Sequence, residues 1–389
     1  MGVYVSKLTD FCDCFIEQTL PMVAAVGCNY GSGPLIEQVK DDWSITEVGF
    51  QRSMLHGRQL YVFSTWGTLL ANPSYLAFAD YVYESLVQHF PGEKPGSWVD
   101  KVSADKEFLP IDASMSLYSH AFVIFGMATY ASLRGSKEAN AHIQSSLKFL
   151  DQFFLRNDAS GLFYSQLNAM YQPATQQLLQ NPHMHLFEAL LQLYALTKRQ
   201  DVLFRLKQLY QKFIHSFLHG HAIIEKAFSN TETDITIEPG HLAEWAWLMR
   251  WADTLFGETL YVPTGQQLLQ SCVRFGWDQA HGGIFDILSY PDLQVVKESK
   301  RLWPQLELIK ALLAYPKDDT LQTVYGCSIE NVAGLLMRYY MKMDGSWFEH
   351  LQKDLQPELG VMPLSSIYHM SMAVLQARGV KELPPVRGR

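Results

Sequence analysis

The sequence lacks the features that mark several large classes of protein. Its 389 residues carry a formal net charge of −8 and contain no Lys/Arg-rich run, which argues against a nucleic-acid partner. No stretch approaches the ~18 uninterrupted apolar residues of a transmembrane helix, and the N-terminal MGVYVSKL has no apolar signal segment. The five cysteines are odd in number and scattered, which argues against a disulfide framework or a zinc site. We therefore expect a cytoplasmic protein without a membrane partner.

Motifs for common cofactors and nucleophiles are also missing. The glycine-rich GCNYGSG at 27–33 lacks the Lys-Ser/Thr of a phosphate-binding loop, and the chain has neither an HExxH nor an EF-hand pattern. A nucleophilic serine in a sharp strand-to-helix turn would need GxSxG, which is absent. We predict no metal and no cofactor.

Helical periodicity is what the chain has in quantity. Apolar residues, 48 % of the total, recur at three- and four-residue intervals, and long β-branched alternating runs are absent. The predicted helices follow one another at spacings of roughly 20 to 35 residues, as helical hairpins do. They cover 53–70, 114–133, 141–155, 183–197, 200–218, 241–255, 263–275, 304–315, 329–341 and 364–377. No linker divides the chain, so we expect one all-α domain over residues 1–389.

Long loops separate some of these helices, at 91–112, 157–181, 220–240 and 276–303. They contain short apolar patches, such as GLFYSQL and GGIFDIL, that are typical of small hairpins. Loops of this length in a compact protein are usually functional or disordered. Because these loops carry aromatic residues, we expect them to be functional.

Three predicted helices begin alike, with a proline and polar groups ahead of an apolar run. The stretches are NPHMHLFEALL (181–191), EPGHLAEWAWL (238–248) and RLWPQLE (301–307). Proline is tolerated in the first turn of a helix. In a closed ring of helical hairpins, an α/α barrel, the inner helices run in one direction. Their N-termini and these polar groups would then meet in a funnel-shaped pocket, where the helix dipoles favour a substrate that becomes negative.

Two histidines in these stretches have a glutamate three residues later, His185 with Glu188 and His241 with Glu244. Each pair lies on one helix face, where it could bind a metal, orient a general base or form a structural hydrogen bond. A neutral imidazole suits proton transfer next to a carbonyl at neutral pH. The resulting enediolate needs donors such as Arg58.

Seven motifs, in order over nearly the whole chain, resemble the N-acylglucosamine 2-epimerase superfamily. They are GRQLYVFS (57–64), YSHAF (118–122), NPHMHLFEALL (181–191), EPGHLAEWAWLM (238–249), KRLWPQLELIKA (300–311), GSWFEHL (345–351) and SSIYHMSMA (365–373). The resemblance implies an (α/α)6 barrel and chemistry at carbon 2 of a free sugar. Members of the superfamily include N-acylglucosamine and cellobiose 2-epimerases and isomerases that act on mannose.

The resemblance also implies the site residues. His241 and His369 correspond to the acid/base pair that moves a proton on and off the sugar. The other positions are expected to bind the substrate through polar groups, carboxylates and apolar walls. They are Arg58, Tyr118, Asn181, His185, Glu244, Trp303, Glu307 and Trp347.

Two departures bear on the subclass. Gln305 stands where N-acylglucosamine 2-epimerases tend to have histidine, and Met370-Ser371 stands where they tend to have Pro-Arg. The motifs are closer to the mannose isomerase branch, in which one base moves a proton between carbons 1 and 2 through a cis-enediol. We expect a metal-independent mannose-type isomerase with a small sugar substrate, as a homodimer.

Three alternatives stay open from the sequence. The first is a sugar 2-epimerase, which must return the proton to the opposite face of carbon 2. The second is a glycoside hydrolase that uses Glu244 and Glu307 on the same barrel. The third is a non-catalytic sugar-binding protein.

Overall fold

The computed structural model describes residues 6–27, 33–105, 107–227, 235–316, 319–358 and 360–380. The described chain is mostly helical and divides into two compact units. The first unit comprises the described residues within Ala24–Glu37 and Glu47–Ser216. The second unit comprises those within Met1–Val23, Gln38–Thr46 and Phe217–Lys381.

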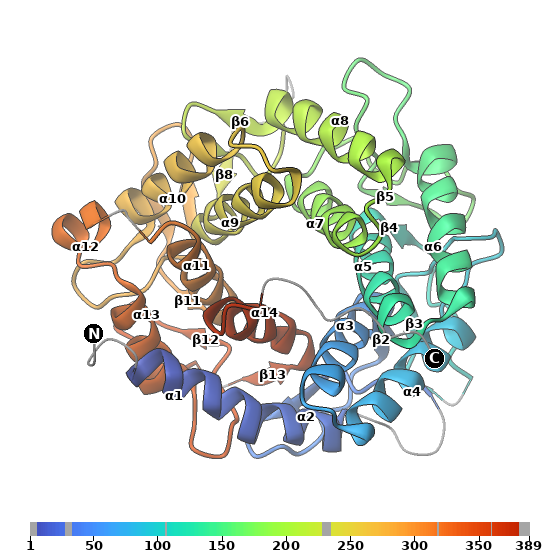
Figure 1. The fold of residues 1–389 in the computed structure, drawn as a ribbon, viewed down its shortest axis with the longest axis horizontal. Helices are drawn as coiled ribbons and strands as arrows, with labels where there is room; N and C mark the ends of the chain where they lie inside the picture. The colour runs from blue at the N-terminus through green and yellow to red at the C-terminus, as the bar shows by residue number, and fades with distance from the viewer. Residues whose placement is uncertain are drawn as a thin grey trace. The chain divides into compact units, whose positions relative to one another are not determined.

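The first unit is built from helical hairpins. Helices α3, α5 and α7 pack side by side in a row, with α4 against α3 and α6 against α5 (Figure 1). Helix α8 contacts α7 through Tyr210 and Phe187, whose ring centres are 6.1 Å apart. The row helices are buried on nearly every face, whereas α8 alternates buried and exposed residues as a surface helix does. The bounds are α3 (Ser53–Leu69), α4 (Pro73–His89), α5 (Leu117–Arg134), α6 (Lys137–Phe149), the π-helical turn η2 (Leu150–Phe154), α7 (Gln180–Thr197) and α8 (Gln200–Phe217).

The second unit repeats this arrangement. Helices α9, α11 and α14 form its row, and α10, α13 and α1 pack against them (Figure 1). Helix α2 (Leu20–Val26) runs from the second unit into the first. The other bounds are α1 (Ser6–Cys14), η1 (Phe15–Thr19), α9 (Pro239–Phe256), α10 (Val262–Gly276), α11 (Leu302–Ala314), α12 (Asp319–Tyr325), α13 (Ile329–Leu335), η3 (Leu336–Tyr340), η4 (Leu364–Ser366) and α14 (Ile367–Ala377).

Short antiparallel strands lie in the loops that precede the row helices. Among the described residues they form one three-stranded sheet, β10-β9-β8, and two-stranded pairs β1-β13, β2-β3, β4-β5, β6-β7 and β11-β12. The predicted hairpin patches fall here, since GLFYSQL contains β5 and GGIFDIL leads into β9. The bounds are β1 (Gln38–Lys40), β2 (Phe50–Arg52), β3 (Lys101–Ser103), β4 (Met115–Ser116), β5 (Gln166–Leu167), β6 (Leu218–His219), β7 (Ala222–Ile223), β8 (Thr236–Ile237), β9 (Ile287–Ser289), β10 (Val295–Lys297), β11 (Lys300–Arg301), β12 (His350–Leu351) and β13 (Val361–Pro363).

Four of the described helices lie outside the predicted ranges: α1, α2, α4 and the short α12. The signal for α4 is nevertheless in the sequence: Asn72 caps the helix by accepting hydrogen bonds from the backbone N–H groups of Ser74 and Tyr75, and Pro73 occupies its first turn. The glycine-rich stretch 27–33 lies mostly outside the described residues. None of the described helices is both long and apolar enough to cross a membrane.

Buried polar side chains fasten the row helices to these loops. His56, His120 and His183 each use Nδ1 to bond the carbonyl four residues earlier, at 2.9, 2.8 and 2.7 Å. Each Nε2 accepts a loop backbone N–H, at 3.2, 3.2 and 3.1 Å. Burial lowers their pKa values to about 3, 4 and 4, which keeps the rings neutral as this bonding requires. These histidines are structural.

Gln305 performs the same task on α11. Its amide Nε2 donates to the Arg301 carbonyl at 3.1 Å, and its Oε1 accepts the Ile284 backbone N–H at 2.8 Å. The amide therefore reproduces both bonds of the buried histidines. Gln305 therefore helps to hold a loop in place. Because a histidine at this position could make the same two bonds, the difference between glutamine and histidine carries little information about the substrate.

Candidate active site

His241 lies in the first turn of α9, where the chain leaves the loop after β8. Glu238 precedes the helix and Pro239 occupies its first position. The buried His241 ring places Nδ1 2.8 Å from Glu225 Oε1 and 4.0 Å from Glu238 Oε2. The Glu238 backbone N–H also donates to Glu225, at 3.2 Å. Glu225 thus fixes both the ring and the start of its helix.

Sequence reasoning missed Glu225 and paired His241 with Glu244 instead. In the structure Nδ1 bonds Glu225, which lies 16 residues before it. The spacing of three residues indicated a shared helix face, but the ring turns toward the loop that precedes the helix. No local pattern marks Glu225, because it lies 16 residues before His241 and contacts it only in the folded chain.

The charge around His241 is strongly negative. Burial alone lowers the pKa of an imidazole, but three nearby carboxylates outweigh that effect and raise the pKa of His241 to about 9. They belong to Glu225, Glu238 and Glu244. The ring is therefore an imidazolium at neutral pH, which suits a proton donor.

His369 lies at the start of α14 and is held in a second way. Its Nδ1 is 2.7 Å from Glu307 Oε1 on α11, and Glu307 Oε2 is 2.6 Å from Lys310 Nζ. Burial alone raises the pKa of Glu307, but the Lys310 ammonium and the His369 hydrogen bond hold that pKa below its usual range. One Glu244 oxygen, one Glu307 oxygen and one His369 ring nitrogen lie within 4.8 Å of one another. The Glu307 carboxylate that bonds His369 is therefore already paired with a cation, the Lys310 ammonium.

Trp303 joins the two histidines. Its ring centre is 5.0 Å from that of His241 and 5.7 Å from that of His369. A side chain at Gly240 would collide with it, since an added Cβ would sit 2.8 Å from carbons of the indole ring. The glycine of the EPGH motif thus makes room for the tryptophan, whose role as an apolar wall for the substrate stays a prediction.

Arg301 supports this arrangement from β11. Its Nη2 is 2.6 Å from Glu238 Oε2, and its Nε is 2.9 Å from Asp286 Oδ1. The guanidinium also lies 5.2 Å from the centre of the Trp303 ring. Arg301 therefore connects the loop carboxylates to the tryptophan between the histidines.

Trp347 is buried and lies against the loop that enters α14. Its Nε1 donates to Glu349 Oε2 at 3.0 Å, and Ser366 Oγ donates to the same oxygen at 2.9 Å. Trp43 packs edge-on against it, with 6.0 Å between the ring centres. These contacts order the residues just before His369.

Other predicted residues gather in the first unit. Arg58 Nη2 on α3 donates to Tyr118 Oη on α5 at 2.8 Å, and its guanidinium lies 4.2 Å from the Phe122 ring centre. His185 packs edge-on against Tyr118 at 5.1 Å, and its Nδ1 is 3.0 Å from Glu188 Oε2. This i,i+3 pair is the one the spacing predicted.

The position of Asn181 says less about its role than the contacts of the residues above. It lies in the first turn of α7 and is half-buried. His185 follows about one turn later, so both residues lie near the N-terminal end of α7.

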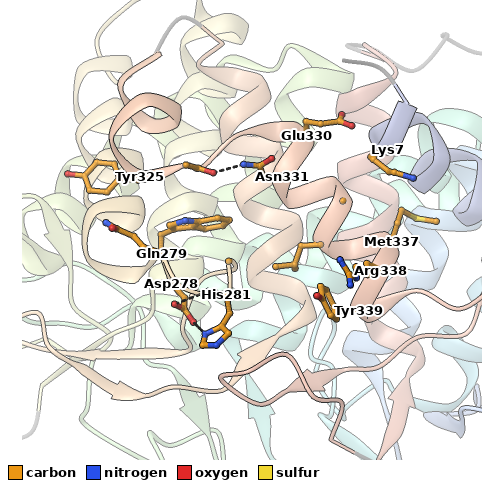
Figure 2. A pocket seen from close by; sticks show the side chains of 15 residues that line it. Lys7, Asp278, Gln279, His281, Tyr325, Glu330, Asn331, Met337, Arg338 and Tyr339 are labelled. Carbon is orange, nitrogen blue, oxygen red and sulfur yellow. Dashed lines mark hydrogen bonds and ion pairs between the residues drawn. The ribbon is translucent and has the colours of Figure 1, made fainter. Parts of the chain in front are cut away.

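A separate cavity of about 660 Å³ opens in the second unit (Figure 2). It lies between the turn at 277–282 and helix α13, and Asp278, His281 and Arg338 are among its lining residues. None of the predicted site residues lines it. The predicted chemistry is therefore tied to the helix ends described above and not to this cavity.

The comparisons with known proteins agree with the sequence motifs. The family described as N-acylglucosamine 2-epimerase matches residues 35–373. A relative in Rhizobium meliloti, named mannose-6-phosphate isomerase, is 25 % identical over 92 % of this chain and 94 % of its own length.

Solved structures show the same fold. A D-mannose isomerase is similar with a TM-score of 0.86 at 20 % identity, over 97 % of this chain and 99 % of its own. A cellobiose 2-epimerase from Bacillus thermoamylovorans is similar with a TM-score of 0.82 at 16 % identity, over 94 % and 98 %. The predicted fold class, the (α/α)6 barrel, is confirmed by these likenesses. The chain belongs to the N-acylglucosamine 2-epimerase family, a family of sugar isomerases and 2-epimerases.

Proposed function

We propose that the protein is an aldose–ketose isomerase that converts mannose-type sugars to the corresponding ketose through a cis-enediol. One observation carries the proposal: two imidazoles lie beside the same indole ring, each with its Nδ1 anchored by a carboxylate. Anchoring Nδ1 fixes the ring orientation and makes Nε2 the nitrogen that exchanges a proton with the sugar. The names of the relatives, D-mannose isomerase and mannose-6-phosphate isomerase, support mannose as the type of substrate.

The two histidines have different charge environments, which suggests separate roles. His241 is an imidazolium at neutral pH because carboxylates surround it, so we assign it the acid role. His369 faces a carboxylate already paired with Lys310, so we assign it the base role. Groups whose environments separate their proton affinities are a usual basis for dividing acid and base functions.

The reaction then moves two protons. His369 Nε2 removes the proton from carbon 2 of the open-chain aldose, while the His241 imidazolium donates its proton to the carbonyl oxygen on carbon 1. The intermediate is the cis-enediol. His369 returns the carbon-bound proton to carbon 1, and His241 recovers a proton from the hydroxyl on carbon 2, which becomes the ketone. In the first unit, sugar binding by Arg58, Tyr118, Asn181 and His185 stays a prediction from the family resemblance.

Proton NMR of the purified protein with D-mannose in deuterated water tests the proposal. We include a chelator so that turnover reports metal-independent chemistry. Fructose should appear, with deuterium on carbon 1 to the extent that the transferred proton exchanges with solvent. Early appearance of glucose would assign the 2-epimerase alternative, and untouched mannose would contradict mannose as the substrate.

The fall of kcat/KM at high pH, the alkaline limb, should reflect the deprotonation of His241. The imidazolium is present below its pKa of about 9, so kcat/KM should fall as pH rises through that value. In Glu225→Gln one negative charge is lost while an acceptor oxygen remains, so the limb should move to lower pH. Profiles of kcat/KM against pH for both proteins measure this shift. Glu298→Gln, which removes a carboxylate from a half-exposed surface ion pair, is the matched control. If the alkaline limb of Glu225→Gln stayed at the native pH, the acid role of His241 would be contradicted.

A further inference from the structure

Lys310 is a fully buried lysine, and one carboxylate, that of Glu307, separates it from His369. It lies one helical turn after Glu307 on α11, and both side chains have no exposed surface. Its Nζ is 2.6 Å from Glu307 Oε2 and 3.9 Å from the centre of the Trp247 ring on α9. The ammonium therefore sits behind the carboxylate, on the side away from the Oε1 that binds His369.

We propose that Lys310 is a positioning residue that keeps the His369–Glu307 pair in its proton-accepting state. The inference rests on the proposed function, because it is the base role of His369 that gives this state its importance. A buried ion pair is weak evidence for stability by itself, since well-packed apolar residues often replace one without loss. A role for Lys310 in the chemistry is suggested because the Glu307 carboxylate contacts both the Lys310 ammonium and the His369 imidazole.

The charges that face His369 explain why a cation is needed there. Glu307 and Lys310 come from α11, and Glu244 comes from α9. Tyr368 is its neighbour on α14, with 4.9 Å between the ring centres, and Glu349 bonds Ser366 just before the helix. Helix α1, which also packs on α14, directs Asp13 to Arg378, nine residues beyond His369. Among these groups of the second unit, Lys310 is the cation nearest to the His369–Glu307 hydrogen bond.

His241 shows what happens where carboxylates predominate. There the nearby acids raise the pKa of the imidazole to about 9, even though Arg301 pairs with one of them. Without Lys310, the His369–Glu307 pair would likewise take up a proton at a higher pH. The proton could rest on the imidazole or on the carboxylate. In the first case His369 cannot accept a proton, and in the second Glu307 no longer stabilises the imidazolium that forms.

Lys310→Met tests the proposal by removing the charge while keeping much of the apolar stem. The acidic limb of kcat/KM should move up by about one pH unit or more, the shift expected when an opposite charge within ~4–6 Å is removed. At pH values below both acidic limbs, a shift of one unit lowers kcat/KM by about tenfold relative to the native protein, and the loss should return at higher pH. Lys353→Met, a half-exposed lysine of the same unit, should leave the profile unchanged.

A second readout does not depend on turnover. In protein labelled with ¹⁵N at histidine, the imidazole signals that vanish in His369→Ala identify His369, and their titration midpoint should rise in Lys310→Met. This titration still tests Lys310 if the native protein does not convert mannose, so the two proposals fail separately. Lys310→Gln serves as a second uncharged variant if the methionine variant is unfolded. A folded variant with an unmoved midpoint and an unmoved acidic limb would overturn the proposal and leave Lys310 a purely structural residue.

Discussion

Replacing His369 by alanine is expected to reduce kcat by about 10²–10⁴-fold, the usual contribution of a general base. The physical reason is that the variant loses the imidazole that Glu307 orients and that we propose as the base. His241→Ala should cost a similar factor, because the developing enediolate would lose its proton donor. Turnover measured by NMR, with far-UV circular dichroism to verify folding, checks both variants.

The matched control for these variants is His281→Ala. His281 lies in the same unit, its side chain is 41 % exposed, and it bonds Asp278 beside the separate cavity. Its loss should leave turnover unchanged. If either His369→Ala or His241→Ala kept native activity while folded, the assignment of the acid/base pair would be wrong.

Glu307→Leu is expected to be the most destabilising single change near the site. It removes the carboxylate from a fully buried pair and leaves the Lys310 ammonium without its counterion, which typically costs about 3–5 kcal/mol of unfolding free energy. Adding Lys310→Met should restore most of that loss, because an uncharged, well-packed pair can be as stable as the buried ion pair. Chemical denaturation of the two variants and the native protein measures the differences.

An exposed ion pair of the same unit provides the comparison. Glu298 and Lys353 are 2.5 Å apart, and both side chains are half-exposed. Glu298→Leu should change the unfolding free energy by less than about 1 kcal/mol, because solvent screens such pairs. If Glu307→Leu were as mild as this control, the buried pair would not be stabilised in the way the geometry indicates.

Most of the helices could be predicted because their signal is local. Periodic apolar residues and capping groups lie within the helix itself, as Asn72 and Pro73 show for α4, where the signal was present but unused. The strands were visible only as short apolar patches. Their partners are set by loops that meet after folding, as in the pairing of β8 with β9, about 50 residues apart.

Candidate site residues divide in the same way. His185 and Glu188 were paired correctly, because a spacing of three residues on a helix fixes their proximity. The same spacing brings Glu244 close enough to His241 to raise its pKa, but Nδ1 of His241 bonds Glu225, which lies 16 residues away. Glu307 and His369 are 62 residues apart, so only the packing of α11 against α14 joins them.

By itself, the sequence determined the helical character of the chain, its family and the histidines on which the proposed chemistry depends, because periodicity and short motifs are properties of contiguous residues. Tertiary structure alone decided which carboxylate holds each histidine and where the balancing cations lie. The charge that surrounds a side chain is a sum over neighbours from distant segments, and burial multiplies its effect. For that reason two histidines that look alike in the sequence have different protonation environments in the folded protein.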